Sequence, residues 1–205
     1  MSDAPAPVAR WVRERRSVRR FLPNDIPSTA EVASLLEAAT WAPSGHNRQP
    51  WRFAVLLDTE NKAKLAEAMG LRLRADRLAD GANAVEVEAD ANRSYARLTQ
   101  SPVVVLMCLT LEEMDRYPDE RRAAAEKLMA VQSVAMAGQN LMLAAHAAGW
   151  GSCWMCAPLF APEEVRLALG LPDAWEPQGA ILLGKPVVQQ SVRPRRPVEE
   201  VVRWG

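Results

Sequence analysis

The sequence predicts an α+β fold built around a central sheet. Its clearest strand covers residues 102–109, because β-branched and almost continuously apolar side chains are typical of a strand covered on both faces. Its clearest helix covers residues 120–148, which are apolar almost all round from Leu128 onward and are followed by Gly149, a favourable residue just beyond a helix end. Further helical and strand patterns occur along the chain without an internal repeat, which predicts a single domain over residues 1–205.

Size and charge restrict the class of protein. The chain has 205 residues, of which 49% are hydrophobic, and this is enough for one domain with a sizeable core. It carries 25 basic and 25 acidic residues, a balance that argues against nucleic acid or a membrane surface as partner. No apolar run reaches the roughly 20 residues needed to cross a bilayer, and the first residues lack the apolar core of a signal peptide. We therefore expect a soluble cytoplasmic protein with reduced cysteines.

In the first half of the chain, Ser28 and Glu31 form a capping box that begins a helix, and this helix ends before Pro43. Residues 51–57 follow as a run of aromatic and aliphatic side chains and predict a buried strand. The other segments of this half are expected to be a loose tail over residues 1–7, a short helix over 7–16, a connecting loop over 17–27, and helices over 61–80 and 86–98.

Beyond the long helix, Pro162 and Gly170 frame one more short helix, and residues 178–184 predict a third strand. Residues 186–205 are expected to form an extended tail with several prolines. A helix that is apolar all round is usually buried on every side, so in a chain of this size the long helix indicates a homodimer.

A dense set of hydrogen-bond donors lies near the start of the chain, formed by Arg15, Arg16, Ser17 and Arg19. A guanidinium group is a planar fork of donors that matches the oxygens of a phosphate, and a serine hydroxyl adds one more hydrogen bond. A second group of arginines, which includes Arg193 and Arg195, lies near the end. These groups are typical of anion binding, although two solvated chain ends are the alternative interpretation.

A second polar segment, residues 42–51 (APSGHNRQPW), joins a helix to a strand. Its short side chains, among them Ser44, Asn47 and Gln49, carry donors and acceptors that match the amide-like edge of a planar heterocycle. A turn that satisfies its own backbone is the alternative.

A third segment, residues 149–158, contains Cys153 and Cys156 at C-x-x-C spacing. Thiol redox chemistry and metal binding are open readings of that spacing, but the further cysteine and histidine ligands of a zinc site are not clustered nearby. We favour side chains that wall an apolar planar ligand, because Trp154 and Met155 suit contact with a ring face. The sequence contains neither a P-loop nor a G-x-G-x-x-G motif for a dinucleotide.

Taken together, these segments resemble the motifs of the nitroreductase family. The matching stretches are residues 15–21 (RRSVRRF), 42–51, 149–153 (GWGSC) and 183–186 (LGKP) with the arginines that follow. The resemblance covers essentially the whole chain. It implies a mostly antiparallel central sheet flanked by helices, and an interlocked homodimer with two sites for flavin mononucleotide (FMN), each built from both chains.

The resemblance also implies roles for individual residues. The phosphate, ribityl chain and pyrimidine edge of FMN are assigned to Arg15, Arg16, Ser17 and Arg19, with Arg193 and Arg195 closing around the phosphate. The partner subunit would contribute Pro43, Ser44 and Asn47, and the segment of Cys153, Trp154 and Met155 would cover the ring. Neither a protein nucleophile nor a metal is implied.

The activity implied is two-electron reduction of a small conjugated acceptor by an FMN-dependent oxidoreductase. The stretch over residues 152–160 (SCWMCAPLF) is similar to the FMN domain of the bifunctional deazaflavin-coenzyme γ-glutamyl ligase, which makes a dehydro precursor of that coenzyme a candidate acceptor and reduced deazaflavin a candidate donor. The alternatives are a broad NAD(P)H-dependent nitroaromatic or quinone reductase, a flavin-binding protein without turnover, a relative that fragments the flavin with oxygen, and a thiol or metal protein.

Overall fold

The computed structural model describes residues 7–188, 191 and 193–205, and it contains one four-stranded sheet. The strands are β1 (Trp51–Leu56), β2 (Val103–Leu109), β3 (Gly151–Met155) and β4 (Glu176–Gly184). They lie in the order β1-β2-β4-β3, and every neighbouring pair is antiparallel. The α+β fold and the antiparallel sheet expected from the sequence are therefore confirmed.

Strand β2 lies inside the sheet, and all seven of its residues are buried. Successive side chains of a strand point to opposite faces, so this strand serves two separate cores. Val105 and Met107 pack with α2 and α5 on one face, whereas Leu106 and Cys108 pack with α3, α4 and α6 on the other. The double covering explains why the sequence of this strand is apolar throughout rather than alternating.

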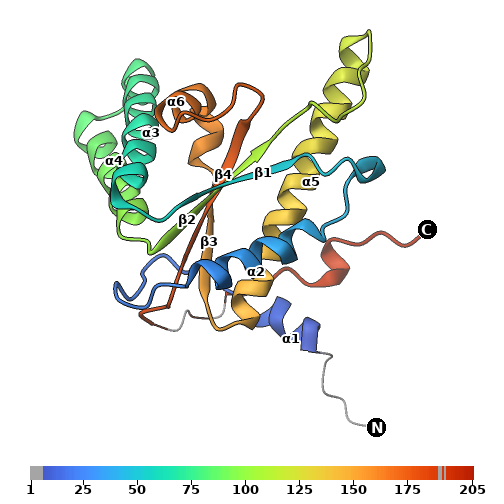
Figure 1. Ribbon diagram of the computed structural model, residues 1–205, viewed down its shortest axis with the longest axis horizontal. Coiled ribbons are helices and arrows are strands. Elements are labelled where there is room, and N and C mark those ends of the chain that lie inside the picture. The colour runs from blue at the N-terminus through green and yellow to red at the C-terminus, as the bar shows by residue number, and fades with distance from the viewer. Residues whose placement is uncertain (1–6, 189–190, 192) are drawn as a thin grey trace.

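The helices form two layers, one on each face of the sheet (Figure 1). The α-helices are α1 (Pro7–Glu14), α2 (Thr29–Thr40), α3 (Thr59–Ala79), α4 (Ala84–Thr99), α5 (Glu120–Ala147) and α6 (Pro162–Ala168). Three short 3-10 turns complete the described elements: η1 (Gly45–Asn47), η2 (Ala157–Phe160) and η3 (Val198–Glu200). The helix α1 packs on α5, next to the end at which β3 begins (Figure 1).

Local signals in the sequence set the helix ends where they were expected. At the start of α2, the Ser28 hydroxyl accepts a hydrogen bond from the Glu31 amide, and the Glu31 carboxylate accepts one from the Ser28 amide, which completes the capping box. The helices α5 and α6 are followed by Gly149 (φ 78°) and Gly170 (φ 59°), in the left-handed conformation that glycine adopts without a steric penalty.

Two expectations about strands were wrong. The strand over residues 51–57 was expected to be buried, but β1 is an edge strand whose four inner residues are only half-buried. The strand β3 was not expected, since the sequence predicted three strands and no secondary structure was assigned to residues 149–158; β3 pairs along the other side of β4.

The two ends of the chain are only partly described. Of the loose tail expected over residues 1–7, residues 1–6 lie outside the described part, and Pro7 already begins α1. In the expected tail over 186–205, residues 189–190 and 192 lie outside it too, and the described residues from 193 onward are exposed, with η3 as their one helical turn.

The helix α5 combines a buried side with an exposed apolar side. Within the described residues it is the one helix that is long and apolar enough to cross a bilayer, and 44% of its most apolar stretch is buried. Its contacts with the sheet and with α2 are those of a core helix. Leu128 and Met136 nevertheless remain exposed, at 57% and 39% of their surface.

Candidate functional site

The arginine-rich segment over residues 15–19 lies along the free edge of β3. The Val18 amide donates a hydrogen bond of 2.9 Å to the Ser152 carbonyl, and Ser17 forms a parallel bridge with Ser152. A side chain at position 151 would stand 2.9 Å from both Val18 and Pro186, so a glycine is needed for this close approach. Gly151, the second glycine of the GWGSC motif, therefore allows the arginine segment to lie against the sheet.

The first and last arginine groups meet in one place, which we call the arginine pocket. It has a volume of about 280 Å³ and is lined by Arg15, Arg16, Ser17, Arg19, Ser191, Arg193 and Arg195. These include all six residues to which the family resemblance assigns the phosphate, the ribityl chain and the pyrimidine edge of FMN. None of the described residues that line the pocket is acidic. A nearly neutral chain thus concentrates positive charge in a single cleft.

The arginines of this pocket repel one another. Burial, followed by the charges of Arg16 and Arg195, lowers the pKa of Arg15 from its ordinary value. The Arg16 Nη1 atom donates to the carbonyl oxygens of Arg13 and Arg15, at 2.5 and 2.7 Å, and its buried Nε finds no partner within the described part of the chain. A bound anion would relieve the repulsion, so the donor set fits a phosphate group.

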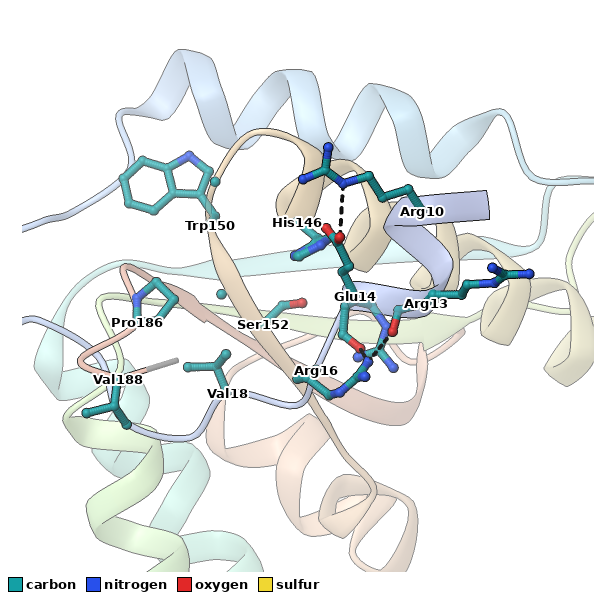
Figure 2. Close-up of a pocket in the computed structure, with 13 residues that line it drawn as sticks. Arg10, Arg13, Glu14, Arg16, Val18, His146, Trp150, Ser152, Pro186 and Val188 are labelled. Atoms are coloured by element: carbon teal, nitrogen blue, oxygen red, sulfur yellow. Dashed lines mark hydrogen bonds and ion pairs between the residues drawn. The ribbon is translucent and has the colours of Figure 1, made fainter. Parts of the chain in front are cut away.

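A larger cavity, of about 710 Å³, lies on the other side of Arg15 and Arg16, between α1, the end of α5 and the start of β3. Figure 2 shows this α1–α5 cavity, in which Arg10 forms an ion pair of 2.9 Å with Glu14. Its wall also contains Ser152, whose buried hydroxyl has no hydrogen-bond partner among the described residues. Sequence reasoning missed Ser152 because it missed β3; the two-residue period of that strand is the signal that would have indicated its inward position.

The loop over residues 42–50 satisfies much of its own polar chemistry. The Ser44 hydroxyl accepts a hydrogen bond of 3.0 Å from the Gln49 amide, and Arg48 forms an ion pair of 2.5 Å with Asp115. His46, Asn47 and Gln49 have positive φ angles of 49°, 55° and 51°. Positive φ angles are costly for residues that carry a side chain, although Asn tolerates them best, so three of them within four residues indicate that the loop is held in a defined shape.

This loop and the arginine pocket lie toward opposite ends of α5. A side chain at Gly45 would touch Met129 in the first third of that helix, whereas His146 in its last turn lines the α1–α5 cavity. At 1.5 Å of rise per residue, these two positions on α5 are about 25 Å apart. Pro43, Ser44 and Asn47 therefore do not join the arginine pocket of their own chain.

The segment expected to cover the flavin ring has its side chains on two faces. Cys153 and Met155 belong to the core with α3 and α6, whereas Trp154 belongs to the core with α5. A Cβ atom at Gly138 or Gly179 would stand 2.5 Å from the Trp154 ring, so this indole fits between two glycines. The Trp154 side chain therefore packs inside this chain.

The three thiols lie in different environments. Burial raises the pKa of Cys108 to about 12, so this thiol stays protonated. Cys153 is also buried, while Cys156 is exposed beyond the end of β3. The described residues contain no group of three or more His, Cys, Asp or Glu side chains arranged to hold a metal ion.

A model of the nitroreductase family matches residues 12–185, a span that includes the arginine segment, the loop and the whole sheet. The chain belongs to the nitroreductase family. A relative from Thermus thermophilus, named NADH dehydrogenase, is 31% identical over 93% of this chain and 92% of its own length. A Bacillus subtilis protein named as an NAD(P)H nitroreductase, YfhC, is 28% identical over 92% of this chain and 89% of its own length.

Solved structures of other proteins have the same fold as this chain. A Desulfovibrio desulfuricans protein, solved as a nitroreductase in complex with FMN, shares 27% identity over 98% of each chain, with a TM-score of 0.74. A flavoprotein from Clostridium difficile, described as BluB-like, has the same fold at a TM-score of 0.78, with 24% identity over 98% of this chain and 99% of its own. The expectation of an enzyme, an FMN-dependent oxidoreductase of the nitroreductase type, is confirmed at the level of the family.

Proposed function

We propose that this chain binds FMN in the arginine pocket and uses it for two-electron reduction of a small conjugated acceptor, with NAD(P)H as electron donor. The observation that carries the proposal is the convergence of the two arginine groups, from opposite ends of the sequence, into one pocket whose described lining holds no acidic side chain. Bound FMN would supply the hydride chemistry. The protein's task is to hold the cofactor and to exclude competing reactions.

Arg15, Arg193 and Arg195 are proposed to bind the phosphate, because several forked donors are needed to neutralise a group with nearly two negative charges. Arg16, Ser17 and Arg19 would provide donors to the ribityl chain and the pyrimidine edge. Cys153 and Met155 are proposed to lie near the ring, while Trp154 would contribute through its backbone, because its side chain is enclosed by α5 and β4.

The FMN site is proposed to need two chains. The loop that carries Pro43, Ser44 and Asn47 is out of reach within one chain, so these residues are proposed to act from the partner subunit of a homodimer. The exposed apolar surface at Leu128 and Met136 supports such an interface.

The names of the relatives, NADH dehydrogenase and NAD(P)H nitroreductase, support a nicotinamide donor for this chain. Reduced deazaflavin as donor, with a dehydro precursor of the deazaflavin coenzyme as acceptor, is the second candidate, and the stretch over residues 152–160 favours it. A single domain over 1–205 and a cytoplasmic location complete the proposal.

The test starts with the visible spectrum of the purified protein. We expect a yellow protein that releases FMN on denaturation and whose absorption near 450 nm is bleached by NADPH without oxygen. Renewed absorption when menadione or a nitroaromatic compound is added, over many turnovers, would distinguish a reductase from a flavin-storage protein. Bound FMN that NADPH does not bleach, but reduced deazaflavin does, would favour the second candidate. A colourless protein that takes up no FMN would contradict the proposal.

A further inference from the structure

The α1–α5 cavity contains a buried hydroxyl that the proposed FMN site leaves unused. Ser152 has 2% of its surface exposed, and its Oγ has no hydrogen-bond partner within the described part of the chain. A buried polar atom without a partner costs free energy, so such an atom in the wall of a cavity indicates a missing ligand. The Ser152 hydroxyl can donate a hydrogen bond to an oxygen of that ligand.

The charges around the cavity identify what that ligand carries. Four arginines line it, and Glu14 is the one acidic side chain among its described lining residues. The ion pair between Arg10 and Glu14 compensates one of these charges. Arg13, Arg15 and Arg16 remain in excess around a single space, which favours a ligand with more than one negative charge.

The remaining walls favour an organic body rather than a bare ion. Val18, Pro186 and Val188 line the side of the cavity away from α1 (Figure 2). The volume of about 710 Å³ is far larger than a phosphate needs and lies inside the usual range of about 300–1,000 Å³ for organic ligands.

We propose that the α1–α5 cavity is a second ligand site, separate from the arginine pocket, that takes an organic diphosphate of the size of a nucleoside diphosphate. Arg13 and Ser152 line this cavity and not the arginine pocket, whereas Arg193 and Arg195 line the arginine pocket and not this cavity. Arg15 and Arg16 form the wall between the two. None of the observations above involves FMN, but the site shares Arg15 and Arg16 with the proposed FMN site, so it is tested on the FMN-saturated chain.

The test is calorimetric titration of the full chain, saturated with FMN, with ADP and in parallel with inorganic pyrophosphate. We expect ADP to bind about tenfold more tightly than pyrophosphate, because only ADP has a body that reaches the apolar walls, and to bind more weakly as ionic strength rises. Equal affinity for both compounds, or no heat from ADP at millimolar concentration, would overturn the proposal.

Two variants, one matched control and one variant of the arginine pocket locate the binding. Arg13→Ala and Ser152→Ala should each weaken ADP binding about tenfold, since each removes one hydrogen bond to a charged group. Ser152→Ala should leave the thermal midpoint unchanged or raise it, because the hydroxyl it removes has no partner in the protein. That combination of weaker ADP binding and an unchanged thermal midpoint would rule out a merely structural role for Ser152.

Arg121→Ala, at the exposed start of α5, removes the same charge outside both pockets and should leave ADP binding unchanged. Arg193→Ala, in the arginine pocket, tests whether ADP binds there instead. If Arg193→Ala weakens ADP binding and Arg13→Ala does not, ADP occupies the arginine pocket and the second site does not exist. If the chain takes up no FMN, the proposed function fails, but the same titrations still decide the second site.

Discussion

The arginine pocket and the loop over residues 42–50 carry the two most specific motifs of the chain, but they differ in what they leave unsatisfied. The pocket gathers guanidinium groups with no acidic side chain among its described lining residues, and a buried donor of Arg16 has no partner there. In the loop, the Ser44 hydroxyl and the Arg48 guanidinium already have partners within the chain. The arginine pocket therefore has donors available for an anion, whereas these polar groups of the loop already have hydrogen-bond or ion-pair partners.

The difference teaches what a single chain can build alone. Affinity for the charged end of a cofactor needs several donors in one place, and the fold supplies them by bringing residues 15–19 next to residues 191–195. The uncharged ring end of the cofactor needs a rigid surface to pack against, and the loop is rigid. Within one chain, however, the loop lies about 25 Å along α5 from the end of that helix next to the arginine pocket. We infer that a second copy of the chain is required to combine them.

The largest expected effect is the loss of FMN affinity on substitution in the arginine pocket. Arg15→Ala should raise the dissociation constant of FMN about 10- to 100-fold, because it removes charge-assisted hydrogen bonds to the phosphate. Quenching of flavin fluorescence on titration of the FMN-free protein measures the change. The neighbouring Arg20→Ala is the matched control, since Arg20 is exposed and does not line the pocket. Equal losses in the two variants would contradict the assignment.

A smaller effect is expected in the loop. Asn47→Asp is close to isosteric and tolerates the positive φ angle, but it replaces an amide donor with a negative charge, so FMN affinity should fall about tenfold. His46→Asn, at an adjacent position with a similar φ angle, should bind FMN normally. If Asn47→Asp also binds FMN normally, the loop has no part in the site.

The attachment of the loop to α5 gives a stability effect. Gly45→Ala would place a methyl group 2.3 Å from the sulfur of Met129, and we expect a loss of about 1–2 kcal/mol, or a fall in Tm of about 2–8 °C. The double variant Gly45→Ala/Met129→Ala makes room for the methyl group. It should be less destabilised than the sum of the two single changes, and strict additivity in thermal unfolding would show that the contact is absent.

The smallest effect is expected from the ion pair between Arg48 and Asp115. Both side chains are well exposed, at 40% and 37%, so Arg48→Met should cost less than about 1 kcal/mol in urea unfolding. A double-mutant cycle with Asp115→Asn isolates the pair energy. A coupling well above that value would mean that the loop depends on this pair rather than on its backbone turns.

Much of the fold could be predicted from local signals. The capping box of Ser28 and Glu31 fixed the start of α2, and β-branched residues marked β2, because these signals act within a few residues. The strand β3 was missed, since its identity depends on pairing with β4 and on the close approach that Gly151 allows. The exposed edge of β1 likewise depends on strand order, which a single segment does not encode.

The candidate site was predictable in composition but not in geometry. The meeting of Arg15 with Arg195 was expected only through the family resemblance, because a contact across most of the chain leaves no local pattern. For Trp154, the residue type favoured contact with a flavin ring. In the structure the alternation of side chains along β3 directs the indole into the core, between Gly138 and Gly179.

The most direct test of the two-chain site is complementation between two defective chains. Arg15→Ala and Asn47→Asp chains with different affinity tags are co-expressed, purified over both tags and titrated with FMN. If the loop acts on the partner's arginine pocket, one site of each mixed dimer is intact and the other carries both changes, so about one FMN should bind tightly per dimer. If no tight site appears, pocket and loop act within the same chain, and the proposed arrangement is wrong.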